Sequence, residues 1–397
     1  MTLGWLVASV LFQIFLADNC NAKESSDFQN VSPTKVENRI ILDEDFSWLS
    51  EKEADLVLDR ISRAGFNVFV PAVWHGRGVS WPSKLAPKEP RWADKRGQSE
   101  TDPLKYLIKR AHALGIEVHP WFTVALRQRD FLRDLYDVGT PEEAFNIHLP
   151  TFRKYIVDVM MDVVQNYDID GVNLDYVRSG MSECRSANYY CDICVSSYCV
   201  ADYQSKTHRD LIRDMALVKQ RLDKVAFDSI AAWNGAAIED IVRSLRMRMT
   251  KSKPYLILSV DTHAGYDWVK FQGANAIKWA NDGVIDLILH MEYDKFEKFR
   301  WPLINNAVKA LKDPKMFVLM VGNYDHSRWN KDDVWARNAK ETAELVKFSQ
   351  KFQPGANIAA LYSYSTLSDE QLVTIRSTAF RTPALPGWHK KRGSSQN

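Results

Sequence analysis

Eight short apolar runs alternate with helical stretches along most of the chain, and this alternation limits the fold more than any other feature. The runs are Arg39–Asp43, Asn67–Trp74, Glu117–Val124, Gly171–Tyr176, Tyr255–Asp261, Asp286–Tyr293, Met316–Gly322 and Asn357–Tyr364. They are nearly continuous in apolar residues, which is typical of parallel strands covered on both faces. Eight strand–helix units without a sign of a second domain predict an α/β fold, a (β/α)8 TIM barrel over residues 39–382.

The segments between the runs have the periodicity of amphipathic helices. Ala54, Val57 and Ile61 lie on one helical stripe, and Ser50 and Glu53 precede it at the spacing of a capping box. An open, doubly wound sheet is the alternative, but no Gly-rich phosphate loop follows the first run. The barrel is therefore the better prediction.

Composition restricts the classes of partner. The 397 residues are 46% hydrophobic and 26% charged, which is the composition of a globular protein. A net charge of +2 argues against nucleic acid as a partner, because a nucleic-acid-binding protein needs a strongly basic face. The 13 Trp, 15 Tyr and 18 Phe residues could pack against sugar rings or fill a core.

The N-terminal segment resembles a signal peptide over residues 1–22. Leu3–Ala17 has the length of the apolar region, and Ala22 suits the cleavage site, although no Lys or Arg precedes the apolar region. The alternative is a disordered or membrane-tethering start. We expect a secreted or periplasmic protein without a stable membrane span after cleavage, a linker over 23–38 and a disordered tail over 383–397.

Four cysteines lie in a long excursion, residues 179–234, that follows the fourth strand and is expected to cover the site. They are Cys184, Cys191, Cys194 and Cys199. In an exported protein an even, clustered set indicates two disulfides, with three possible pairings. A zinc site is the alternative, because Cys191 and Cys194 have the spacing of a ligand pair. We predict disulfides and no metal.

Side chains at the carboxyl ends of barrel strands point into the site, so the strand ends supply the candidate residues. They are Asp43, Asp45, Trp74, His75, His119, Trp121, Asn173, Asp175, Arg178, Asp261, His263, His290, Glu292, Asp294, Asn323, Tyr324, Tyr362 and Tyr364. Asp175 is the strongest, because a carboxylate at the end of a buried strand is costly unless it is paired or used. A structural bridge between Asp175 and Arg178 is the alternative.

A glycoside hydrolase uses two carboxyl groups, so Asp175 would need a partner, and two residues are candidates for that role. Glu292 is preferred over Asp261 because a glutamate reaches farther into a barrel mouth. The histidines near strand ends could instead form the metal site of a metal-dependent hydrolase, although hydrogen bonding to substrate is the better interpretation. No cofactor is predicted.

Several motifs together resemble those of the glycosyl-hydrolase-like family 10 barrels. They are Gly65–Val70, Gly76–Gly78, Trp81–Lys84, Asp102–Leu104, Ala111–His112, Gly115–Trp121, Asp168–Arg178, Lys253–Pro254, Gly283–Asp286 and Met291–Tyr293. The most specific of them ends in Asp175 and Arg178. The resemblance implies an exported barrel that cleaves glycosidic bonds in poly- or oligosaccharides.

The sequence thus predicts a glycoside hydrolase with Asp175 as nucleophile or base and Glu292 or Asp261 as its partner. The predicted substrate-binding residues are Trp74, His75, His119, Trp121, Asn173, Arg178, His263, His290, Tyr293, Tyr324 and Tyr364. The rival to an enzyme is a glycan-binding barrel that keeps the aromatic cleft without a working carboxylate pair. The sugar, the linkage and the oligomeric state stay open.

Overall fold

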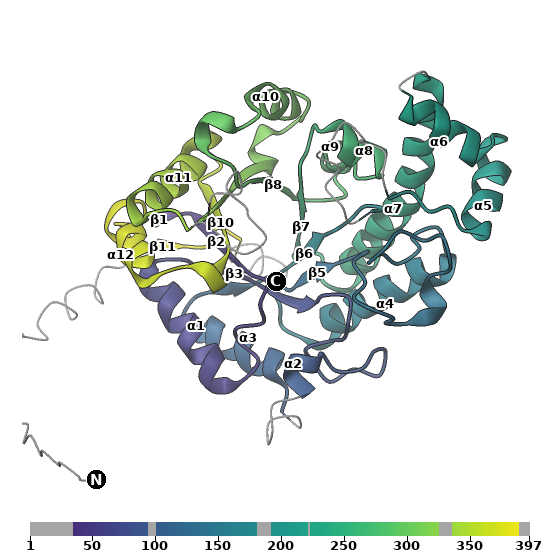
Figure 1. The fold of residues 1–397 in the computed structure, drawn as a ribbon. Coiled ribbons are helices and arrows are strands. Elements are labelled where there is room, and N and C mark those ends of the chain that lie inside the picture. The colour runs from purple at the N-terminus through teal and green to yellow at the C-terminus, as the bar shows by residue number, and fades with distance from the viewer. Residues whose placement is uncertain (1–34, 94–100, 181–191, 221–222, 325–335, 389–397) are drawn as a thin grey trace, which may run out of the picture.

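The computed structural model describes residues 35–93, 101–180, 192–220, 223–324 and 336–388, and these residues form a closed parallel barrel. Figure 1 looks along the barrel axis, with the strands at the centre and helices around them. The strands are β2 (Asn38–Asp43), β3 (Val68–Trp74), β4 (Glu117–Val118), β5 (Trp121–Thr123), β6 (Gly171–Asp175), β7 (Ile257–Thr262), β8 (Leu287–Glu292), β9 (Phe317–Gly322) and β10 (Ile358–Tyr362). The (β/α)8 prediction is confirmed.

Two pairings of β2 close the barrel, one with β3 and one with β10. Strands β4 and β5 both pair with β3 and are two pieces of one barrel strand, so nine strands occupy eight positions. Pro120 lies between the two pieces and has no N–H to donate to the ladder. Gly171 opens β6 because a Cβ atom there would lie 2.5 Å from Nδ1 of His119.

Helices surround the strands and bury one face each against them. They are α1 (Glu51–Ala64), α2 (Pro90–Ala93), α3 (Pro103–Ala113), α4 (Pro150–Asn166), α5 (Ser197–Thr207), α6 (Leu211–Lys219), α7 (Lys224–Ser252), α8 (Asp267–Phe271), α9 (Ala276–Asn281), α10 (Trp301–Lys309), α11 (Ala339–Phe352) and α12 (Asp369–Thr378). Helix α1 begins as predicted, since the Ser50 side chain accepts the backbone N–H of Glu53.

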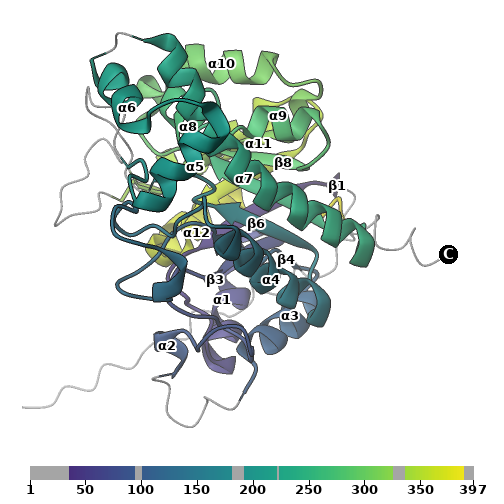
Figure 2. The same ribbon diagram turned by 90° about the vertical axis from the view of Figure 1, so that its right-hand side faces the viewer.

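The two ends of the described chain pair with each other. Strand β1 (Lys35–Val36) pairs in parallel with β11 (Ala384–Leu385), and the N–H of Gly387 donates to Asn38 Oδ1 at 2.7 Å. Residues 35–38 and 383–388 were expected in the linker and the disordered tail; the structure instead orders both segments by this pairing. Figure 2 shows β1 on the side of the barrel opposite α2, α5 and α6.

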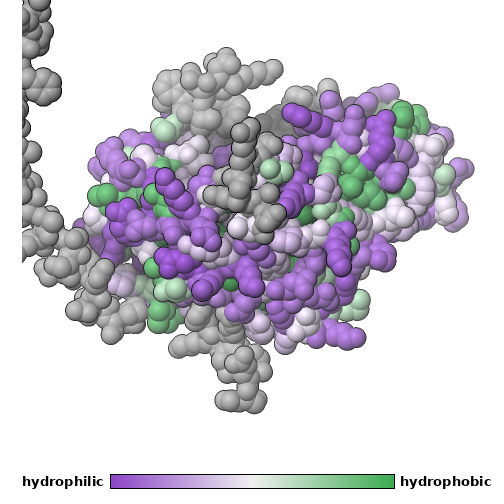
Figure 3. All heavy atoms as spheres, turned by 90° about the horizontal axis from the view of Figure 1, so that it is seen from below, coloured by the Kyte–Doolittle hydropathy of each residue, from purple (hydrophilic) through white to green (hydrophobic). Residues whose placement is uncertain are grey.

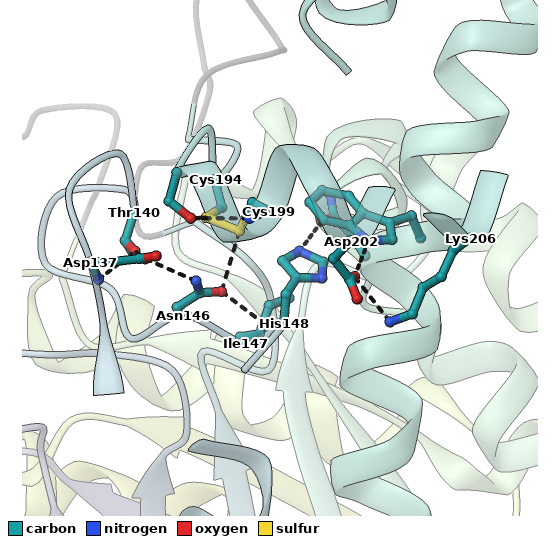
Figure 4. The surroundings of a disulfide bond; sticks show 12 residues. Asp137, Thr140, Asn146, Ile147, His148, Cys194, Cys199, Asp202 and Lys206 are labelled. Atoms are coloured by element: carbon teal, nitrogen blue, oxygen red, sulfur yellow. Dashed lines mark hydrogen bonds and ion pairs between the residues drawn. A yellow bond between two sulfur atoms is a disulfide. The ribbon is translucent and has the colours of Figure 1, made fainter. Parts of the chain in front are cut away.

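The described part of the excursion after β6 contains α5, α6 and the start of α7. In Figure 1, α5 and α6 lie at the outer edge of the molecule and not over the ring of strands. A disulfide joins Cys194 to Cys199, with an S–S distance of 2.08 Å. Figure 4 shows it beside Asn146, whose Oδ1 lies 3.4 Å from Cys199 Sγ. Cys184 and Cys191 lie outside the described residues, so their pairing stays a prediction.

The large apolar core lies inside the barrel and between the strands and helices. The face seen in Figure 3 is mainly hydrophilic, and its hydrophobic residues form small separate patches. In the described ranges, no helix combines the length and the apolar character that a membrane span requires. The predicted signal peptide lies outside these ranges.

Candidate active site

A pocket of about 150 Å³ lies at the carboxyl ends of the strands. Its lining comes from most of the barrel strands or from the residues that follow them. These residues are Leu42, Glu44, Trp121, Asp175, Tyr176, Arg178, Asp261, Met291, Tyr293, Tyr324 and Tyr362. Six of them were predicted site residues: Trp121, Asp175, Arg178, Asp261, Tyr293 and Tyr324. The position agrees with the rule that barrel sites form at this face.

Asp175 is the last residue of β6 and is only 6% exposed. Its Oδ1 accepts the backbone N–H of Tyr176 at 2.6 Å, where the backbone turns with a φ of 49°. The Arg178 guanidinium lies over the Tyr176 ring, 4.4 Å from its centroid, and its Nε donates to Gly180 O. The turn after β6 therefore carries a carboxylate and a cation to the same pocket.

Asp261 reaches the pocket from β7, the strand beside β6, and is held by Asn173. The Asn173 Nδ2 donates to Asp261 Oδ1 at 2.8 Å and to Ser259 Oγ at 2.9 Å. Burial raises the pKa of Asp261 well above its usual value, and the charge of Asp175 raises it further, while the Asn173 hydrogen bond acts in the opposite direction. The Asp261 carboxyl group therefore favours its protonated form.

Glu44 is a third carboxylate in the pocket and was not predicted. It follows β2, and its side chain is 29% exposed. Its Oε1 lies 3.0 Å from His75 Nε2, and its Oε2 accepts the Tyr362 hydroxyl. Burial raises the pKa of Glu44 to about 7; the Tyr362 hydrogen bond opposes this rise, and the Asp175 charge adds to it.

Four aromatic side chains form one wall of the pocket. The Tyr293 ring stacks on Tyr362 with 5.1 Å between centroids and an interplanar angle of 21°. Tyr324 lies 5.6 Å from Tyr293, and Trp121 meets Tyr362 edge-on at 6.2 Å. Flat rings with hydroxyl groups offer an apolar face together with hydrogen-bonding positions, as a sugar ring requires.

Glu292, His290 and His263 form a separate cluster that does not line this pocket. Glu292 Oε1 accepts the Tyr266 hydroxyl at 2.8 Å and lies 3.2 Å from His290 Nε2. The His263 ring lies 6.2 Å from that of His290. Alternation along β8 explains the separation: Met291 lines the pocket, so the residues on either side of it point the opposite way. The structure does not bring Glu292 together with Asp175.

Four further predicted residues do not line the pocket. Each contacts another side chain: Phe145 for Trp74, the pocket residue Glu44 for His75, Glu117 for His119 and Arg60 for Tyr364. Asn173 is the fifth, since it holds Asp261 from below. His75 and Asn173 thus contact pocket carboxylates and act behind the surface that a substrate would touch.

Glu44 escaped prediction, and Tyr362 was a strand-end candidate that was not among the predicted substrate-binding residues, although a pattern marks both. Leu42 and Glu44 alternate with Asp43 and Asp45, so only one pair can face the barrel mouth. Asp43 is buried on the other side, where both of its oxygens bind Ser47, and Asp45 is exposed. Tyr362 lies at the end of β10 and has the same alternation.

No group of three or more His, Cys, Asp and Glu side chains within the described ranges is arranged to hold a metal ion. The strand-end histidines contact carboxylates and aromatic rings instead.

Solved structures share this fold at low sequence identity. The glycoside hydrolase domain of PgaB (BpsB) from Bordetella bronchiseptica superposes with a TM-score of 0.57 at 12% identity, covering 85% of this chain and 98% of that domain. Alpha-L-fucosidase isoenzyme 2 from Paenibacillus thiaminolyticus gives 0.51 at 15% identity, covering 86% of this chain and 49% of that one. Both comparisons support the fold alone.

Sequence comparison identifies the family. Glycosyl hydrolase DigH of Escherichia coli O6:H1 is 21% identical over 285 residues, which are 64% of this chain and 58% of the relative. Glycosyl hydrolase YngK of Bacillus subtilis is 22% identical over 268 residues, 60% of this chain and 48% of the relative. The match thus spans only about half of these curated relatives. The pattern of the glycosyl hydrolase-like 10 family matches residues 40–138 and 127–316, more than half of the chain. The chain therefore belongs to the glycosyl hydrolase-like 10 family.

Proposed function

We propose that the protein is a glycoside hydrolase that cleaves O-glycosidic bonds in a poly- or oligosaccharide. The observation that carries the proposal is the pocket itself, which Asp175 lines together with Glu44, Asp261 and the aromatic wall. In this reaction Asp175 meets the positive charge that develops at the anomeric carbon, as nucleophile or as base. Family membership supports the same reaction class.

The buried Asp261 supports Asp175 instead of competing with it for charge. Two carboxylates that share a small buried site do not both ionise, and the one with the raised pKa keeps its proton. Asp175 is then the ionised member of the pair.

The disulfide supports an oxidising compartment as the place where the protein acts. A bond between Cys194 and Cys199 persists in secreted or periplasmic proteins and is rare in the cytosol. We propose that the protein acts after export. Titration of free thiols in protein recovered from the producing cells, without reductant, tests this: reduced Cys194 and Cys199 would argue against it.

The Asp175→Asn variant tests the proposed reaction. Purified protein is incubated with a panel of soluble and insoluble polysaccharides, and the released reducing ends are measured. We expect the wild type to cleave at least one polymer and the variant to lose about three to four powers of ten in rate, because Asn keeps the shape of Asp without its charge.

Binding and melting temperature, measured on the same samples, separate the alternatives. Retained glycan binding with lost turnover supports the proposal, whereas binding without cleavage by the wild type would identify a glycan-binding barrel. A lowered melting temperature with unchanged turnover per folded molecule would make Asp175 a structural partner of Arg178.

A further inference from the structure

Glu44 occupies a position in the pocket that the proposed reaction has not yet used. It lines the same small space as Asp175 and the aromatic wall, and its side chain is the partly exposed one of the three carboxyl groups there. We propose that Glu44 donates the proton to the leaving-group oxygen, an assignment that rests on the proposed glycoside hydrolysis. Glu44 is the most exposed of the three and so extends farthest toward a leaving group at the mouth of the pocket, whereas Asp261 is 2% exposed.

Two hydrogen bonds fix the Glu44 carboxyl group in the mouth of the barrel. Gln128 Nε2 lies 3.4 Å from His75 Nδ1 and donates to His75 O at 2.9 Å, so Nδ1 acts as the acceptor. The His75 proton therefore lies on Nε2 and points to Glu44 Oε1 at 3.0 Å. The Tyr362 hydroxyl donates to Oε2. Each oxygen keeps a second lone pair that can carry the transferable proton.

The charges around Glu44 favour a protonated carboxyl group near neutral pH. The titratable groups that face it are Asp43, Asp45, His75, Asp175, Tyr293 and Tyr362. Burial, which is the largest cause, and the negative charges of the three aspartates raise the pKa of Glu44 to about 7. Burial lowers the pKa of His75 to about 4, so this ring stays neutral and adds no positive charge beside Glu44. A general acid is most effective when its pKa lies near the working pH.

The step balances with water as the only co-reactant. The Glu44 O–H bond breaks, and its proton goes to the glycosidic oxygen while the bond from that oxygen to the anomeric carbon breaks. The electron pair stays on the departing oxygen, which leaves as an alcohol. Water then supplies a hydroxyl group to the anomeric carbon, and its remaining proton returns to a pocket carboxylate.

The leaving group provides a test that a structural role would not pass. The polysaccharide that the wild type cleaves is compared with the dinitrophenyl glycoside of the same sugar, whose leaving group departs without a proton. For Glu44→Gln we expect a loss of about 10²- to 10⁴-fold on the polysaccharide and less than about tenfold on the aryl glycoside. The matched control is Asp59→Asn, an exposed acid on α1 outside the pocket, which should keep both rates.

The pH profile gives the second readout. The wild-type rate on the polysaccharide should fall as pH rises through about 7, and Glu44→Gln should lack this limb. If Glu44→Gln lost equal activity on both substrates, or if its rate still fell as pH rises through about 7, the assignment of Glu44 would be wrong. The proposed glycoside hydrolysis would be unaffected by either result. A wild type that cleaves nothing in the panel would overturn the hydrolase and the assignment together. If Glu44→Gln melts early, Glu44→Asp, which shortens the reach by one methylene, should show the same substrate split.

Discussion

At the scale of single residues, Asp261 shows how burial in a barrel can keep a carboxyl group in its neutral, protonated form. Its Oδ1 accepts from Asn173, and its Oδ2 has no hydrogen-bond partner among the described residues. An ionised carboxylate with an unpartnered buried oxygen is costly, whereas a carboxylic acid at the same place is not. Burial therefore selects the neutral form and leaves the negative charge of the pair to Asp175.

This reasoning predicts that Asp261→Asn is mild where Asp175→Asn is severe. The amide replaces a carboxyl group that is already neutral and still accepts the Asn173 hydrogen bond. We expect the variant to keep its rate within about tenfold, a change of about 1.4 kcal/mol in the barrier. Steady-state rates of both variants on the same polysaccharide check this. A loss at Asp261 as large as that at Asp175 would mean that Asp261 supplies charge or a proton itself.

At the scale of the element, the strands were predictable and the direction of their side chains was not. Each apolar run matches a strand to within one or two residues at its ends, except that Glu117–Val124 is split by Pro120 into β4 and β5. Parallel strands are buried on both faces, so their hydrophobic pattern does not mark which residues face the barrel axis. For this reason the sequence predicted Glu292 as a site residue, whereas its neighbour Met291 lines the pocket. In the same way Asp43 and Asp45 were candidates, whereas Glu44 between them lines the pocket.

The site was predictable where polar residues alternate with apolar residues along a strand, as they do in the motif that ends β6. Asn173 and Asp175 are two residues apart in a strand of polar and apolar residues, and the structure connects both of them to the pocket. The aromatic wall was predicted only in part, because it combines residues far apart in sequence whose rings meet only when the barrel closes. The contact between Glu44 and His75 depends on the loop after β3 and had no sequence signal.

The paired end segments give a prediction at the same scale. The Trp388 ring lies 5.3 Å from that of His119, beside the first residues of the strands. Trp388→Ala should lower the free energy of unfolding by about 2 kcal/mol, because a half-buried ring is removed from a packed site. Turnover per folded molecule should stay unchanged, because the ring lies at the opposite end from the pocket. Chemical unfolding and rates on one sample check this, with Trp388→Phe as the control that keeps an aromatic ring.

At the scale of the whole molecule, stability should depend on pH through Asp43. Burial raises the pKa of this fully buried carboxyl group from 3.8 to about 6, against the hydrogen bonds from Ser47. The folded state then holds the proton more tightly than the unfolded state, so the contribution of Asp43 to stability is full below pH 4 and is lost as pH rises to about 6.

The Asp43→Asn variant isolates this contribution. The variant cannot lose a proton at this position, so its stability relative to wild type should rise between pH 4 and pH 6, by up to about 3 kcal/mol, and then level off. Urea unfolding of both proteins across this range is the measurement. A difference that does not change with pH would show that folding does not raise the pKa of Asp43.

The pairing of β1 with β11 also determines where on the molecule a tether or a fused domain would be attached. Both described ends leave the barrel side by side, at the end opposite the pocket. A linker fused to either end would emerge on that side, and a protein tethered there would present its open mouth outward, toward a polymer in front of it. Joining the two ends by a short peptide and cutting the chain elsewhere should likewise be tolerated, since neighbouring ends are what circular permutation requires.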